Sequence, residues 1–121
     1  MKMELLVISN HPPEKWADDQ KAGWDVIDYI PFPDVPAAES LEEVIDLSQP
    51  IISQIRDWRE RHPDGRVSIQ GEFTLSAYLL LAVEKLWGWC FSFPTTERQV
   101  VEEVKDRGTL RKTVFRFVRW R

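Results

Sequence analysis

The sequence has little of the chemistry that marks common enzyme and metal sites. Its 121 residues contain one cysteine, Cys90, and two histidines, His11 and His62. A single cysteine excludes an internal disulfide, and neither histidine belongs to a cluster with the spacing of metal ligands. The sequence also lacks the glycine-rich G-x-G-x-x-G and Walker A patterns, and no Ser-His-Asp or Cys-His pair is assignable from spacing. We therefore expect no metal ion and no cofactor, and a small core residue at Cys90.

Long hydrophobic runs are missing as well. The longest mainly apolar stretch, Leu75 to Val83, is too short to cross a bilayer. The N-terminus passes almost at once into a predicted strand, so we expect no signal peptide, no membrane contact and a cytoplasmic location. A hydrophobic content of 43% and a charged content of 30% are typical of one globular domain of this length.

The charge is small in total and uneven along the chain. The formal net charge is −4, which argues against broad binding to DNA or another long nucleic acid. Residues 95–121 hold eight Lys and Arg against four Asp and Glu, for +4, whereas residues 1–94 carry −8. A basic end is most often a solvated surface, but it leaves room for a small phosphorylated ligand at a local basic site.

One stretch in the second half of the chain predicts a βαβ unit. Val67–Gln70 is a short β-rich run. Residues 75–86 are apolar nearly all round, which predicts a helix covered on most sides, with Gly88 just past its C-terminus. Trp89–Phe93 is a second apolar strand, which Pro94 should end. Two strands joined through a helix should be parallel, with a right-handed crossover.

The N-terminal half predicts two more strands. Glu4–Ser9 is continuously apolar, as expected for a central parallel strand buried on both faces. A short helix should follow at Glu14–Ala22, with Trp16, Ala17 and Gln20 facing the sheet. Asp25–Ile30 alternates polar and apolar residues and is expected nearer an edge of the sheet.

A proline-rich connector and a helical segment join these strands to the βαβ unit. Three prolines in residues 31–36 exclude helix and hold the chain extended. Residues 39–61 have the apolar spacing of a helix, but Pro50 interrupts it. We expect two short helices or one kinked helix, with Ser48 a candidate cap at the break, and then a turn at residues 62–65.

The C-terminal segment leaves two alternatives open. Gln99–Lys105 suits a short helix or one arm of a hairpin that turns near Asp106–Gly108. Arg111–Trp120 is rich in aromatic and β-branched residues and predicts a strand, which favours the hairpin. The whole chain therefore predicts an α/β fold, with a mainly parallel central sheet flanked by helices and a C-terminal antiparallel β-hairpin.

Three polar segments follow strands that should be parallel, so their side chains should meet at one edge of the sheet, where open α/β folds bind ligands. Gly71 would let a ligand approach the backbone, and the amides of the helix beginning near Thr74 would favour a phosphate, as would Arg98. The candidate ligand-binding residues are Asn10, His11, Gly71, Glu72, Phe73, Thr95, Thr96 and Arg98. Each also has an ordinary explanation, such as a turn at Asn10 or a helix cap at Thr96; only the shared edge favours a site.

Four motifs give the chain a resemblance to a known family. They are LLVISNHP with Trp16 close behind it, the central GEFTLSAYLLL, TTER at residues 95–98, and the terminal FRFVRWR. Over nearly its whole length the sequence resembles small stand-alone proteins of type III CRISPR systems, which consist of a single Rossmann-like domain of the CARF kind. The resemblance implies one CARF-like domain over residues 1–121 that forms a homodimer. It also implies that the dimer binds a cyclic oligoadenylate, with cyclic tetra-adenylate as the expected ring.

The resemblance also implies a reaction. Some members are ring nucleases, in which a ribose 2′-hydroxyl attacks the neighbouring phosphate without a metal ion and leaves a 2′,3′-cyclic phosphate end. Carried onto this chain, the catalytic candidates are Arg98 for the phosphate charge and His11 or Glu72 for proton transfer. Other members bind and sequester the ring without cutting it, and the motifs do not separate the two. A third alternative is an unrelated Rossmann-like structural or interaction protein.

Overall fold

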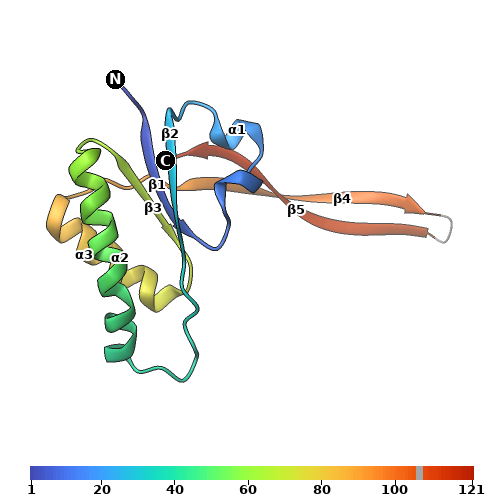
Figure 1. The fold of residues 1–121 in the computed structure, drawn as a ribbon. Coiled ribbons are helices and arrows are strands. Elements are labelled where there is room, and N and C mark those ends of the chain that lie inside the picture. The colour runs from blue at the N-terminus through green and yellow to red at the C-terminus, as the bar shows by residue number, and fades with distance from the viewer. Residues whose placement is uncertain (106–107) are drawn as a thin grey trace.

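The structure is a computed structural model that describes residues 1–105 and 108–121. Within these ranges the chain forms a three-stranded parallel sheet in the order β2-β1-β3, two long helices and a C-terminal antiparallel hairpin (Figure 1). The predicted α/β class, the parallel sheet and the hairpin are thus confirmed. No helix in these ranges combines enough length with enough hydrophobicity to cross a lipid bilayer.

The central strand is β1, Glu4–Ser9, and every residue after Glu4 in it is buried. Its neighbours are β2, Val26–Pro31, on one side and β3, Arg66–Gln70, on the other, both parallel to it. The prediction that β1 is a central parallel strand buried on both faces, drawn from its continuous apolar run, is thus confirmed. The more polar β2 lies at an edge, also as predicted.

Helix α2, Leu41–Arg61, begins with a capping box in which Ser40 and Glu43 exchange hydrogen bonds. Of the two alternatives for Pro50, two short helices are wrong, because a single helix runs through this proline. Ser48 is not a cap either, since its hydroxyl donates to the Ile45 carbonyl within the helix. Apolar residues on both sides of Pro50 pack into one core, and this packing outweighs the backbone hydrogen bond that proline removes.

Helix α3, Phe73–Trp87, ends as predicted at Gly88, whose φ of +74° favours glycine. One side of α3 packs through Leu79 and Val83 into the core that α2 and the sheet share. The other side of α3 is exposed at Phe73 and Leu81. The prediction that α3 is buried on most of its sides is therefore wrong for a single chain. Figure 1 shows α2 and α3 together on one side of the sheet, opposite α1.

Two predicted elements are shorter in the structure. In place of a helix at 14–22 there is a 3₁₀ turn, η1, Pro13–Lys15, and a single turn of helix, α1, Asp18–Lys21. They are separate because the backbone is extended at Trp16 and at Ala17, with ψ near 150° at both.

The predicted strand Trp89–Phe93 is reduced to one parallel bridge between Phe91 and Val67. Pro94 does not end a strand but begins one, β4, Pro94–Lys105. A proline is tolerated at the first residue of a strand because the ladder does not require its missing N–H there. The direction of the predicted strand was right, and its length was wrong.

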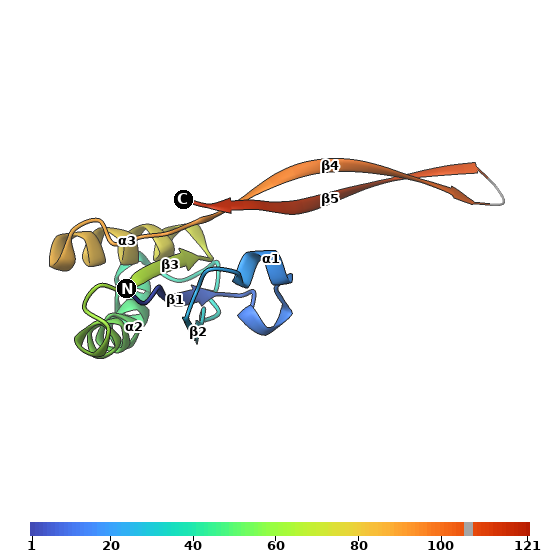
Figure 2. The same cartoon turned by 90° about the horizontal axis from the view of Figure 1, so that it is seen from above.

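The hairpin consists of β4 and β5, Gly108–Trp120, with a register shift between Thr95 and Thr96. The hairpin alternative is thus confirmed, and the prediction of a polar loop at Thr95–Arg98 is wrong because these residues belong to β4. The predicted turn at Asp106–Arg107 lies outside the described residues. Seen from above in Figure 2, the hairpin leaves the body beside β3 and extends far beyond it.

The base of the hairpin is held by tryptophan. The ring of Trp120 lies 5.5 Å from the ring of Trp16 and 5.5 Å from that of Trp24, and its indole N–H donates to the Gln20 carbonyl at 2.9 Å. The backbone of Arg121 also exchanges two hydrogen bonds with Phe93. The contacts of Trp120 attach the end of β5 to the segment around η1 and α1, and those of Arg121 attach it to the chain just before β4.

Replacing Trp120 by Ala should remove this attachment. Because the ring is partly buried, we expect the free energy of unfolding to fall by about 2–3 kcal/mol, below the range for fully buried aromatic residues. Urea unfolding followed by far-UV circular dichroism measures the change. Phe73→Ala is the matched control, since its ring is 86% exposed and its loss should cost less than about 0.5 kcal/mol. Equal losses in the two variants would contradict the attachment.

Candidate functional site

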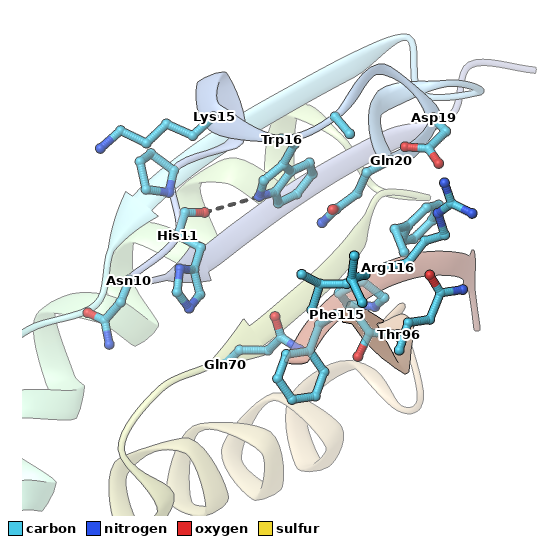
Figure 3. Close-up of a pocket in the computed structure, with 17 residues that line it drawn as sticks. Asn10, His11, Lys15, Trp16, Asp19, Gln20, Gln70, Thr96, Phe115 and Arg116 are labelled. Atoms are coloured by element: carbon cyan, nitrogen blue, oxygen red, sulfur yellow. Dashed lines mark hydrogen bonds between the residues drawn. The ribbon is translucent and has the colours of Figure 1, made fainter. Parts of the chain in front are cut away.

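A groove of about 1140 Å³ opens at the carboxyl end of β1, between the η1–α1 segment and the hairpin (Figure 3). One wall comes from the loop after β1 and the short helical turns, the other from both strands of the hairpin. Gln70, the last residue of β3, lies between them. The groove therefore occupies the edge of the sheet where the sequence predicts a site.

Ser9 fixes the start of the first wall. Its hydroxyl accepts the backbone N–H of His11 at 3.0 Å, and its carbonyl accepts the hydroxyl of Tyr29 at 2.7 Å. The His11 carbonyl in turn accepts the indole N–H of Trp16 at 3.2 Å. With the backbone of His11 held on both sides, its imidazole and the side chain of Asn10 line the groove. Within the described residues the imidazole makes no hydrogen bond, so both ring nitrogens are open to a ligand.

The second wall is built from side chains of both strands of the hairpin. Thr96 and Gln99 come from β4, and Phe115 and Arg116 come from β5. Figure 3 shows Phe115, Arg116 and Thr96 across the groove from Trp16. Trp120 holds the base of the hairpin against the first wall through Trp16 and the Gln20 carbonyl.

The groove combines cations with aromatic rings. Lys15 and Arg116 line it, and neither has an ion-pair partner among the described residues. Asp19 contributes a carboxylate to the same lining. The rings of Trp16 and Phe115 and several side-chain amides complete it. This set suits a ligand that is anionic, has flat faces for stacking and carries hydrogen-bonding edges.

The predicted site residues separate into two groups. Asn10, His11 and Thr96 come together in the groove, although they are far apart in sequence. Five others, all described, are not part of its lining: Gly71, Glu72, Phe73, Thr95 and Arg98. Whether any of the eight binds a ligand remains a prediction, but the structure gives several of the second group a clear local role.

Gly71 makes room for a side chain of the protein itself. A Cβ atom at this position would lie 2.4 Å from the ring of Phe32, which is buried in the core. The absence of a side chain at Gly71 therefore lets Phe32, from the proline-rich connector, pack closely against the backbone. On the side where a Cβ atom would point, the space beside Gly71 is thus filled by Phe32 and is closed to a ligand.

Glu72 is the N-cap of α3. Its carboxylate accepts the backbone N–H groups of Thr74 at 3.0 Å and Leu75 at 2.8 Å. These hydrogen bonds, first that from Leu75 and then that from Thr74, lower the pKa of Glu72. The amides predicted to bind phosphate are thus already occupied by a carboxylate of the chain, and that part of the prediction is wrong.

Thr95 and Arg98 belong to the hairpin. The Thr95 hydroxyl donates to the Arg119 carbonyl at 2.9 Å, which joins the two strands near their base. Arg98 is exposed on β4 opposite Phe115. The guanidinium that lines the groove belongs to Arg116, on the other strand.

The groove residues that the sequence analysis did not name as site candidates include Lys15, Trp16, Gln70, Gln99, Phe115 and Arg116. A signal for two of them was present, because the motif FRFVRWR places aromatic and basic residues in alternation. Without the register of β4 against β5, however, the sequence does not tell which strand face turns towards the body.

The other titratable candidates lie elsewhere. His62 contacts the Glu4 carboxylate and packs on the ring of Trp58, at the opposite end of β1 from the groove. Cys90 is a core residue as predicted, and burial raises the pKa of its thiol. No group of three or more His, Cys, Asp or Glu residues in the described ranges is arranged to hold a metal ion.

Comparison with known proteins places the chain in a family. The model of the Uncharacterized protein MJ1673 family matches residues 3–121, so the chain belongs to that family. No curated protein and no solved structure matches the chain.

The Glu72 cap should make stability depend on pH. Because the pKa of Glu72 is lowered in the folded state, its carboxylate stabilises the fold above its ordinary pKa, and this contribution is lost as pH falls through the lowered value. Glu72→Gln should therefore be less stable than the natural protein at pH 7, and the difference should shrink towards pH 3. Urea unfolding at several pH values measures it.

Glu84→Gln is the matched control for this prediction. Glu84 is exposed near the other end of α3, and its carboxylate makes no hydrogen bond with a described residue. Its replacement should not reproduce the loss at neutral pH. A stability difference for Glu72→Gln that is the same at pH 7 and pH 3 would contradict the electrostatic role of the cap.

Proposed function

We propose that this member of the MJ1673 family binds a cyclic oligoadenylate in the groove, with cyclic tetra-adenylate as the expected ring, and cuts it as a metal-independent ring nuclease. It would thereby end type III CRISPR signalling as a CARF-like, Rossmann-like domain. The observation that carries the proposal is the groove itself, where two cations that have no ion-pair partner in the described part of the chain lie among aromatic and amide side chains.

The strand order supports a nucleotide ligand at this position. The order is β2-β1-β3, and the Phe91 bridge adds a further parallel segment beside β3. Doubly wound sheets of the 2-1-3-4-5 kind share this order, and they bind ligands where the order reverses, between the first and third strands. Asn10 and His11 after β1 and Gln70 at the end of β3 line the groove at that point.

The size and chemistry of the groove support an oligonucleotide over a single small metabolite. Its volume of about 1140 Å³ exceeds the roughly 300–1,000 Å³ of typical small-molecule pockets. Trp16 and Phe115 would stack on adenine faces, and Lys15 and Arg116 would neutralise phosphates. Asn10, Gln70, Thr96 and Gln99 offer donors and acceptors to base edges and ribose hydroxyls.

The proposed reaction needs one proton relay. A ribose 2′-hydroxyl attacks the adjacent phosphorus, the bond from phosphorus to the 5′-oxygen breaks, and a 2′,3′-cyclic phosphate and a 5′-hydroxyl result. His11 would take the proton of the 2′-hydroxyl or supply one to the leaving 5′-oxygen. Arg116 would balance the charge that grows on the phosphate oxygens, the role that sequence reasoning gave to Arg98.

Binding without cleavage is the second candidate function. Of the three catalytic candidates from the sequence, only His11 lines the groove, and the Glu72 carboxylate is engaged at the cap of α3. In-line cleavage by one imidazole depends on the ring being held in the attacking geometry. A protein that holds it in another geometry would sequester the signal.

Incubation with labelled cyclic tetra-adenylate in EDTA separates the two functions. We expect the ring to disappear and a product with a 2′,3′-cyclic phosphate to form. His11→Ala should slow cleavage about 100-fold while binding persists, because general acid–base catalysis contributes at least that much. His62→Gln, at the far end of β1, is the histidine control and should cut normally. A ring that is bound but uncut identifies the second function; no binding of cyclic tetra- or hexa-adenylate would overturn both.

Arg116→Ala should weaken binding of the ring about tenfold or more, since a charge-assisted hydrogen bond to phosphate is lost. Lys112→Ala is the matched control, because it removes one positive charge from the same strand outside the groove lining. Fluorescence anisotropy with a labelled ring, at two salt concentrations, measures both. Equal weakening by the two variants would mean that the general charge of the hairpin attracts the ligand and the groove does not select it.

A further inference from the structure

The outer part of the hairpin carries apolar side chains that the described residues leave exposed. We call residues 98–105 and 109–115 the arm. Val104 is 88% exposed, Phe115 70% and Val100 63%. A two-stranded ribbon is marginally stable in water at best, and exposed apolar patches on soluble proteins commonly mark contacts with a partner. The arm therefore has the character of an interface that a single chain leaves open.

These exposed residues share one face of the arm. In an antiparallel pair, directly opposite residues point to the same side and alternate pairs to opposite sides. The register gives one face, here called the Val100 face, with the pairs Arg98 and Phe115, Val100 and Thr113, Glu102 and Arg111, and Val104 and Thr109. Arg111 and Glu102 form an ion pair across the strands at 3.1 Å.

We propose that the Val100 face binds the same face of a second copy of this chain, with the two arms stacked antiparallel about a two-fold axis at Val100 and Thr113. In that arrangement Val100 lies over Val100 of the second copy and Thr113 over its Thr113. Two residues to either side, Arg98 of one copy lies over Glu102 of the other, and the contact occurs twice by symmetry.

The pattern of charge selects this arrangement. An axis at Glu102 and Arg111 would place each of these charged side chains over the same side chain of the second chain, so that like charges meet. An axis at Arg98 would likewise place Arg98 over Arg98. On the opposite face, an axis at Val101 and Lys112 would place Lys112 over Lys112. Among axes that run across the strands through one pair of the described arm and have their neighbouring pairs described, only the axis at Val100 and Thr113 keeps charge off the centre and puts opposite charges beside it.

The aromatic residue of this face gains a partner too. Phe115 and Arg111 lie on β5 at equal distances from Thr113, so the symmetry places Phe115 of one copy over Arg111 of the other. A guanidinium over an aromatic ring is a favourable contact. Because Phe115 also lines the groove, the second copy's arm would lie at the rim of the groove. The inference does not depend on what the groove binds.

Cysteine cross-linking tests the arrangement in the full-length protein. Val100→Cys and Thr113→Cys should each form a covalent dimer with a short bismaleimide, since both lie on the axis. Val101→Cys and Lys112→Cys, on the opposite face, are the matched controls and should remain mostly uncross-linked. The native Cys90 is buried and should stay silent. Cross-linking through Val100→Cys without Thr113→Cys would indicate edge-to-edge pairing of β4 and overturn the stacked arrangement.

Charge reversal gives an independent measurement. By sedimentation equilibrium we expect a dimer, with Arg98→Glu raising its dissociation constant at least tenfold and Glu97→Arg, on the opposite face, leaving it unchanged. The double variant Arg98→Glu with Glu102→Arg should recover part of the loss, because the opposite charges are restored across the axis. Circular dichroism checks that each variant is folded. A natural protein that is still monomeric at about 100 micromolar, a concentration at which even a weak complex forms, would overturn the proposal. Equal effects of Arg98→Glu and Glu97→Arg would overturn it as well.

Discussion

The groove depends on the packing of Trp120 against Trp16 and Trp24. These three rings come from the end of β5 and from both sides of α1, and the Trp120 indole N–H also bonds to Gln20. α1 is a single turn, too short to hold its place alone, and the hairpin leaves the sheet after one bridge at Phe91. Each element is positioned by the other, and the space between them is the groove.

The parallel sheet contributes fixed chain ends to this space. Ser9 closes β1 with hydrogen bonds from His11 and Tyr29, so that the loop leaves the sheet in one direction. At β3 the chain turns under a different constraint, because Phe32 fills the space beside Gly71 and Glu72 caps α3. The loop after β3 thus serves the core and the helix, while the loop after β1 is free to serve a ligand.

The helix cap and the hairpin each changed the chemistry expected from the sequence. A carboxylate at the start of α3 satisfies the amides that would otherwise attract phosphate, so positive charge in the groove must come from side chains. The hairpin supplies it from β5, where Arg116 lines the groove. Farther from the body, the same hairpin carries the exposed Val100 face. One element therefore contributes both to the candidate ligand site and to a surface suited to a second chain.

The sequence alone determined β1, β3, α3 with its glycine end, the strand Arg111–Trp120, and the position of Asn10 and His11 after β1, because periodicity and strand direction are local properties. The sequence favoured the hairpin without excluding a helix, and Thr96 reaches the groove from β4 in place of the predicted loop. Only the tertiary structure decided that α2 continues through Pro50, that Gly71 faces Phe32, and that Arg116 lines the groove while Arg98 lies outside it. These outcomes depend on core packing and on strand register, and a shift of one residue in register would turn every side chain of the hairpin to the other face.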